Sequence, residues 1–154
     1  MHMSKPVWWL LYTAIGIWLQ NFLPGADLFV PGLLVCLQEE GPVPAFWLSC
    51  LWLIIQEGAG SLHFGVGVLW YAGLWIMFYG GKMMLESRSG VFIILYAVFS
   101  GSYHFFLLQI FSRLQGLDIP LGLQLQDSLR QIFVLPFLWV VLLSLYRWRE
   151  RSHA

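Results

Sequence analysis

The chain has 154 residues, of which 59% are hydrophobic and only 10% are charged, and its formal net charge at pH 7 is zero. A water-soluble domain carries about 25% charged residues to keep its surface hydrated, so this composition excludes an ordinary soluble domain and indicates an integral membrane protein. The balanced charge also leaves no basic surface for a nucleic acid.

Six apolar segments follow one another and predict a single transmembrane helical domain over residues 1–154. They are Val7–Leu23, Leu28–Leu37, Pro44–Ile55, Phe64–Tyr79, Val91–Phe111 and Ile132–Tyr146. The second and third segments are short, because a perpendicular helix needs ~20 residues to cross ~30 Å of hydrocarbon. They either cross as short helices or form a re-entrant pair that turns at Glu39 and Glu40, and both options require surrounding helices. The expected fold class is all-α, a compact bundle of about six transmembrane helices.

The distribution of Lys and Arg chooses between five and six crossings. Six crossings place six cations on one side of the membrane, namely Lys5, Lys82, Arg88, Arg147, Arg149 and Arg151, against Arg113 and Arg130 on the other. If Leu28–Ile55 were one span, the split would be three against five. Because cytoplasmic loops are enriched in these residues, we expect six segments with both termini cytoplasmic. The polar connector Ser112–Gln131 would then lie outside, and its mixed periodicity predicts neither helix nor strand.

The strongest polar signal lies at the end of the third segment, where Gln56 and Glu57 precede a glycine-rich turn. The glycines are Gly58, Gly60, Gly65 and Gly67, and they permit a sharp reversal of the chain. A carboxylate near the hydrocarbon edge costs a few kcal/mol. Glu57 is therefore interpreted either as reaching water or capping a neighbouring helix, or as an inward-facing acid that orients the bundle or docks a partner. A proton relay with His63 is the weaker alternative.

Three further polar residues stand out. His104 lies well inside the longest apolar segment, Val91–Phe111, where an intramembrane histidine is by default a functional candidate, although a neutral imidazole with one hydrogen bond also suits a bundle core. Glu39 and Glu40 precede Gly41 and Pro42 in a predicted cytoplasmic turn. They are interpreted as solvated turn residues, or else as a docking point for a cytoplasmic protein.

No sequence motif for catalysis, a cofactor or a metal accompanies these residues. The chain has no HExxH, no CxxC and no glycine-rich phosphate loop, so we expect no enzyme activity, no cofactor and no metal. Cys36 and Cys50 both lie in apolar segments and are interpreted as buried small hydrophobic residues. No two glycines are four residues apart, so the GxxxG motif for helix association is absent.

Between Ala26 and Leu85 the chain resembles the rod-shape-determining membrane protein family MreD. The resemblance consists of a short span, the polar turn Gln38–Pro42, a second short span that ends at an acidic residue, and glycines that lead into the next span. Glu57 stands at the acidic position, where the family usually has Asp, and Gly60 and Gly65 match the glycines. The chain departs from the family in two places: Ala26-Asp27 replaces the usual opening proline, and the polar turn lacks a basic residue.

This resemblance implies a multi-pass protein of the bacterial inner membrane that regulates cell shape and peptidoglycan synthesis. It would be a non-enzymatic scaffold that contacts membrane lipid and binds MreC, the actin-like MreB and the cell-wall synthase pair. The family is similar in fold to the substrate-binding subunits of energy-coupling-factor transporters, which are six-helix bundles.

Two rival functions remain open. The first is the substrate-binding membrane subunit of a small vitamin or metal transporter, so a small-molecule ligand is not excluded. It requires polar side chains from different spans to face one pocket, and the candidates are Ser49, Gln56, Glu57, Ser100, His104 and Gln109. The second is a membrane enzyme that uses His63 or His104. The scaffold is favoured because the sequence shows no convergent polar lining.

Overall fold

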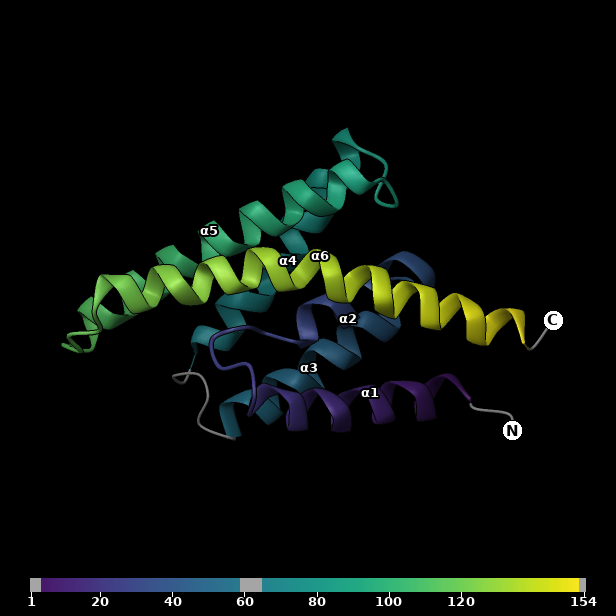
Figure 1. Ribbon diagram of the computed structural model, residues 1–154, viewed down its shortest axis with the longest axis horizontal. Helices are drawn as coiled ribbons and strands as arrows, with labels where there is room; N and C mark the ends of the chain where they lie inside the picture. The colour runs from purple at the N-terminus through teal and green to yellow at the C-terminus, as the bar shows by residue number, and fades with distance from the viewer. Residues whose placement is uncertain (1–3, 59–64, 153–154) are drawn as a thin grey trace.

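The protein is described by a computed structural model over residues 4–58 and 65–152, and these residues form six helices and no strand (Figure 1). In chain order the helices are α1 Lys5–Gln20, α2 Phe29–Glu39, α3 Pro42–Gly58, α4 Val66–Met84, α5 Gly90–Leu114 and α6 Leu121–Arg151. The predicted all-α class is confirmed, and each predicted apolar segment corresponds to one helix. The start of α1 and the end of α6 lie at the same end of the molecule (Figure 1).

The main difference from the sequence-based expectation is the length of α6. This helix begins at Leu121, so the second half of the predicted irregular connector is helical. Gln124, Ser128 and Gln131 recur at helical spacing, and all three are buried. The Nε2 atom of Gln124 donates to the Oγ atom of Ser112 on α5 at 3.3 Å. The helical periodicity of this stretch is not visible as a pattern of apolar residues, because the face that it buries is polar. The other helices bury apolar faces.

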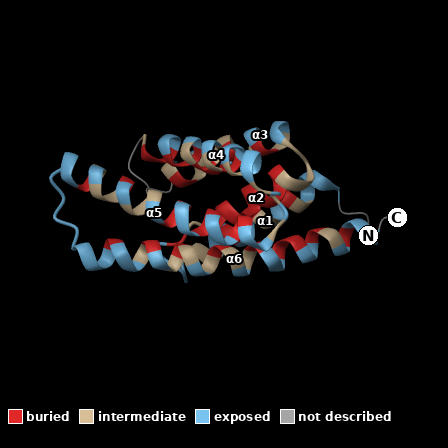
Figure 2. Ribbon diagram, turned by 90° about the horizontal axis from the view of Figure 1, so that it is seen from above, coloured by how far each residue is buried: buried red, intermediate tan, exposed pale blue. Residues whose placement is uncertain are grey.

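Helix α2 lies at the centre of the fold. Every residue from Phe29 to Leu37 is buried, and the helix packs against α1, α3 and α6 (Figure 2). Its 11 residues span about 16 Å at 1.5 Å per residue, roughly half of a hydrocarbon core. The stability of such a short, buried helix depends on its packing against the neighbouring helices.

Close approach between helices depends on small residues at the contact points. At Gly32 of α2, an added Cβ atom would overlap the ring of Tyr12 on α1. The Tyr12 hydroxyl accepts a hydrogen bond from the backbone N–H of Gly32 at 3.1 Å. Glycine is therefore required at this position because the neighbouring ring occupies the space of a side chain.

By length and composition, two helices in the described part of the chain could cross a membrane unaided, namely α5 and α6. The predicted bundle of about six transmembrane helices is thus supported for its two longest members only. The other four crossings remain a prediction, as does the multi-pass location in an inner membrane.

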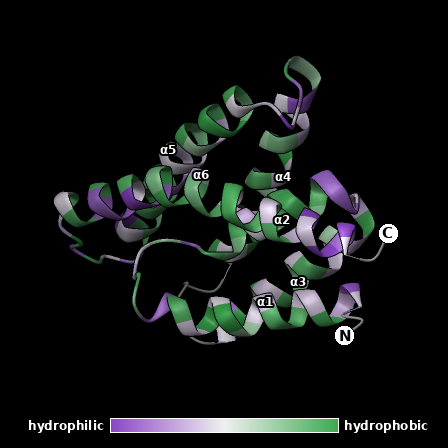
Figure 3. Ribbon diagram, turned by 45° about the vertical axis from the view of Figure 1, so that its right-hand side comes forward, coloured by the Kyte–Doolittle hydropathy of each residue, from purple (hydrophilic) through white to green (hydrophobic). Residues whose placement is uncertain are grey.

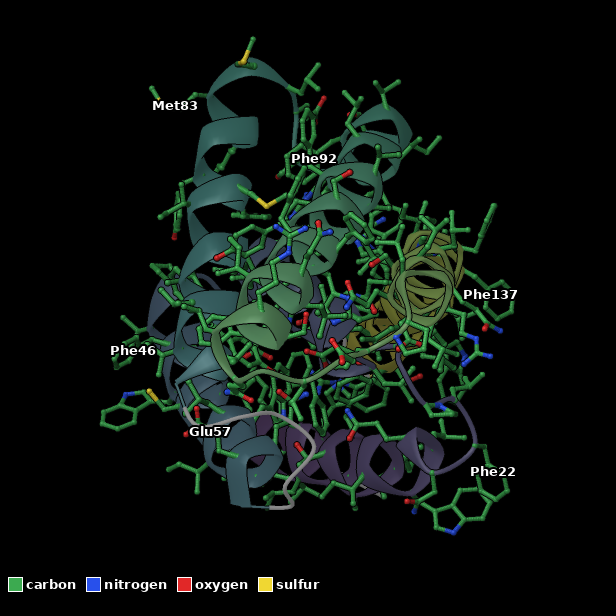
Figure 4. The ribbon with its side chains drawn as sticks, turned by 90° about the vertical axis from the view of Figure 1, so that its left-hand side faces the viewer. Phe22, Phe46, Glu57, Met83, Phe92 and Phe137 are labelled. Carbon is green, nitrogen blue, oxygen red and sulfur yellow. The ribbon has the colours of Figure 1, made fainter. Side chains whose placement is uncertain are left out.

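Large apolar side chains also cover the outside of the molecule. Met83 and Ile76 on α4 are 89% and 73% exposed, and Phe133 on α6 is 74% exposed. Figure 3 shows hydrophobic residues along outward-facing parts of the helices, and Figure 4 shows Phe22, Phe46 and Phe137 directed away from the bundle. Apolar residues therefore lie on both the inner and the outer surfaces of the helices.

Candidate functional site

A half-buried aspartate, Asp27, lies in the connection between α1 and α2. Its Oδ1 atom accepts hydrogen bonds from the backbone N–H of Phe29 and from Nε2 of Gln56, both at 2.9 Å. Its Oδ2 atom accepts from Nε1 of Trp70 at 2.8 Å. The backbone N–H of Asp27 donates to Oε1 of Gln131 at 2.8 Å. One residue therefore joins the α1–α2 connection to α3, α4 and α6.

Local structure explains how this carboxylate comes to lie at the start of α2. Asp27 is two residues before Phe29, the first residue of the helix, and its side chain accepts a hydrogen bond from that residue's N–H. Asp and Asn side chains commonly bond to the backbone two residues on, which satisfies a donor that the helix leaves unpaired. The positive end of the helix dipole also favours a negative charge at this place.

The electrostatic environment of Asp27 consists of neutral donors. Among the described residues, no Lys, Arg or His forms an ion pair with its carboxylate. Burial raises the pKa of the Asp27 carboxyl, and the hydrogen bonds from Trp70, Phe29 and Gln56 act in the opposite direction. Burial is the larger effect, so the carboxyl holds its proton more tightly than an exposed aspartate does.

A cavity of about 310 Å³ borders Asp27. It is lined from four helices and the α1–α2 connection by Gln20, Leu23, Pro24, Gly25, Ala26, Asp27, Gln56, Val66, Trp70, His104, Leu107 and Leu108. Leu23, Pro24 and Gly25 are exposed on the outer side of the connection. The cavity is therefore covered on this side by a stretch of non-helical chain.

His104 is the second titratable residue in the cavity wall. Its ring packs edge-on against the indole of Trp70, with 5.1 Å between ring centroids, and Trp70 in turn stacks on Tyr103 at 5.7 Å. The Nδ1 atom of His104 is buried and has no hydrogen-bond partner among the described residues. Trp70 thus contacts both Asp27 and His104 and places them along one wall.

Of the predicted pair at the end of α3, Gln56 belongs to this site and Glu57 does not. Glu57 is half-buried, and its Oε1 atom accepts a hydrogen bond from the backbone N–H of Gly65, just before α4, at 3.1 Å (Figure 4). This is the helix-capping alternative for Glu57, with a carboxylate at the positive end of a helix. Gly65 has a φ of +87°, a conformation that glycine adopts readily.

The other residues of the predicted glycine turn add little to the site. Gly58 is the last residue of α3 and is exposed, with no atom within 4 Å of an added Cβ. Gly60 and His63 lie outside the described residues, so the predicted relay between Glu57 and His63 stays a prediction.

Glu39 and Glu40 form a second polar cluster, at the opposite end of α2 from Asp27. Glu40 Oε1 accepts hydrogen bonds from Nε1 of Trp9 at 3.0 Å and from the hydroxyl of Tyr146 at 2.6 Å. Glu39 pairs with Arg147 at 3.1 Å and with Arg88 at 3.3 Å. The solvated turn that we expected is instead a junction between helices, because α2 ends beside α1, α6 and the α4–α5 connection.

The expected lack of a convergent polar lining is wrong in part. Gln56 and His104, two of the six candidates for a shared pocket, do line one cavity. Ser49 instead accepts a hydrogen bond from Nε1 of Trp75, and the hydroxyl of Ser100 donates to the carbonyl of Ala97. Glu57 and Gln109 are absent from the cavity lining. The convergence is therefore limited and centres on Asp27.

Sequence reasoning missed Asp27 as a site residue and noted it only as a departure from the family pattern. A local signal was present: an aspartate stands just before a short apolar run that is buried on all sides. An aspartate at that spacing favours a hydrogen bond to the helix start. Its convergence with Gln56, Trp70 and Gln131 had no sequence signal, since these residues are 29, 43 and 104 positions away.

Comparisons with known proteins found no relative: no family model, no curated protein and no solved structure matches the chain.

Proposed function

We propose that this protein is a membrane-embedded, non-enzymatic scaffold that binds partner proteins through its apolar exterior, in the bacterial cell-elongation machinery. The observation that carries the proposal is the exposure of large apolar side chains on the outer helices, such as Trp18 on α1, Trp47 on α3 and Ile76 on α4, which are 62%, 68% and 73% exposed. Extended apolar surface marks contact with lipid or with a partner.

The arrangement of the polar groups supports the same proposal. Glu39, Glu40 and Asp27 are all engaged by groups of the chain itself, so these carboxylates stabilise the bundle and leave an apolar exterior for partners. The ion pairs of Glu39 bring together the α2–α3 turn, the α4–α5 connection and the C-terminal part of α6. These are three of the regions that the positive-inside rule assigns to one membrane side.

The choice of partners rests on the family resemblance alone. Partners of the kind found with that family, namely MreC, MreB and the cell-wall synthase pair, would bind while lipid covers the remaining surface. Regulation of peptidoglycan synthesis and cell shape would be the output, in a bacterial inner membrane. The protein itself would carry out no chemical step.

The test is photo-cross-linking in the native membrane, followed by identification of the attached proteins by mass. A photoreactive residue at Phe46 on α3 and another at Phe137 on α6 sample two outer faces (Figure 4), at side chains that are 55% and 69% exposed. We expect at least one of them to capture a cell-elongation protein. The same residue at Trp52, a large side chain that is fully buried, is the matched control and should capture none.

Two results would contradict the proposal. One is the absence of any protein adduct at both outer positions, with no cell-elongation protein in a detergent pull-down. The other is recovery with an ATPase pair and a transmembrane coupling subunit, which would favour the transporter subunit.

A further inference from the structure

The cavity beside Asp27 has the features of a binding site for a small cation. A carboxylate has about four lone-pair positions, and Asp27 uses three of them for Phe29, Gln56 and Trp70. Its remaining acceptor position has no hydrogen bond or ion pair among the described residues. A carboxylate that is partly withdrawn from water is costly to ionise, and a positive partner offsets this cost.

We propose that this cavity binds a small organic ammonium ion, with Asp27 as its counter-ion and Nδ1 of His104 as a second hydrogen-bond acceptor. The ligand would donate one N–H to the carboxylate and another to the imidazole. Both acceptors line the same cavity and are held by the same indole, that of Trp70.

The size and lining of the cavity favour an organic cation over a bare metal ion. At about 30 Å³ per non-hydrogen atom, as in liquid water, a volume of 310 Å³ holds roughly ten such atoms. Val66, Leu107 and Leu108 line it together with Trp70, and these side chains suit an apolar body. A metal ion would need several ligands, yet no group of three or more His, Cys, Asp or Glu side chains in the described part of the chain could hold one.

The α1–α2 connection offers a ligand a route into the cavity. Leu23, Pro24 and Gly25, which line the cavity, are exposed and belong to the α1–α2 connection. Figure 1 shows this connection as a non-helical stretch that leads from the end of α1 into α2. Displacement of a short non-helical stretch disrupts fewer backbone hydrogen bonds than displacement of a helix does.

The test is calorimetric titration of the purified full chain in detergent with three probes of similar size and different charge. Benzylammonium is the cation, benzyl alcohol is the neutral analogue, and benzoate is the anion. We expect benzylammonium to bind saturably and at least tenfold more tightly than benzyl alcohol, with no binding of benzoate. Equal affinity for the three probes, or no saturable binding of benzylammonium, would overturn the proposal.

Three variants test whether the binding of benzylammonium depends on Asp27 and His104. Asp27→Asn should reduce the affinity for benzylammonium to that for benzyl alcohol, and Asp118→Asn is the matched control because Asp118 is exposed outside the cavity. His104→Phe should weaken binding several-fold. Unchanged binding by Asp27→Asn would overturn the proposal.

Asp27 also forms hydrogen bonds to several helices, so Asp27→Asn can fail to fold. In that case a variant that fills the cavity tests whether benzylammonium binds there. Leu108→Trp adds bulk to the cavity wall at a residue that makes none of the hydrogen bonds of Asp27. A folded Leu108→Trp protein that no longer binds benzylammonium supports the site, and one that binds it as before overturns it. This titration uses the isolated protein, so its result is independent of the cross-linking that tests the scaffold.

Discussion

The indole of Trp70 donates a hydrogen bond of 2.8 Å to the carboxylate of Asp27, across 43 residues of chain. Trp70 is buried, at 2% exposed, and its ring also packs against His104 and Tyr103. Asp27 is half-buried. The bond fixes the start of α2 relative to α4. It also places the carboxylate at the edge of the cavity.

Trp70→Phe is expected to destabilise the protein by about 1.5–3 kcal/mol, because it removes a hydrogen bond from a buried indole to an ionisable acceptor. The measurement is unfolding of the purified protein in mixed micelles with increasing denaturing detergent. Trp75→Phe on the same helix is the control, since it removes a bond of 3.1 Å to the neutral hydroxyl of Ser49. Its expected cost is about 0.5–1.5 kcal/mol. A Trp70 variant no less stable than the Trp75 variant would contradict the assigned bond.

The stability of the wild-type protein should fall relative to Asp27→Asn as the pH rises. Burial raises the pKa of the Asp27 carboxyl in the folded protein, so the folded state binds this proton more tightly than the unfolded state does. The resulting stabilisation is fully present below the unfolded-state pKa of about 3.9 and is lost as the pH rises through the folded-state pKa. Asparagine does not titrate and lacks this dependence.

Unfolding of both proteins in detergent between pH 4 and pH 8 measures this difference. A stability difference that stays constant over the whole range would show that Asp27 has no raised pKa. Asp118→Asn is the control, because it makes the same change of side chain at an exposed position outside the cavity.

Glu39→Gln is expected to lower stability modestly, by about 0.2–1 kcal/mol, and only at low salt. Its partners Arg88 and Arg147 have side chains that are 53% and 43% exposed, so water and ions screen both pairs. Unfolding in 0.05 M and 1 M NaCl should show the loss shrinking at the higher concentration. Tyr146→Phe removes a bond of 2.6 Å between a fully buried tyrosine and Glu40, and its effect should persist in 1 M NaCl. Equal salt dependence of the two variants would argue against this distinction.

Gly101→Ala is expected to cost about 1–3 kcal/mol through overpacking between α5 and α6. A Cβ atom at Gly101 would overlap Ile132 and lie 3.1 Å from the backbone oxygen of Ser128. The control is Gly80→Ala, at a helical glycine with no atom within 4 Å of an added Cβ. It should be neutral or stabilising by up to about 1 kcal/mol, because alanine is the better helix former. Unfolding in detergent measures both, and a Gly101 variant as stable as the wild type would contradict the close packing.

The sequence alone determined the class of fold and the places where helices occur. Low charge and apolar runs separated by Pro, Gly and polar turns were sufficient, because these signals are local. The start of α6 was missed for a physical reason. Its first turns bury Gln124, Ser128 and Gln131. The main sequence signal for a helix is the spacing of apolar residues, and that signal is absent where the buried face is polar.

The tertiary structure alone decided which polar residues meet. Glu57, the most prominent acid in the sequence, caps α4 locally, whereas Asp27 collects donors from α3 and α4. The reason is that burial and hydrogen bonding of a carboxylate depend on how helices pack, and packing brings together residues that no spacing rule connects. The same packing made α2 the central helix although it is the shortest of the six.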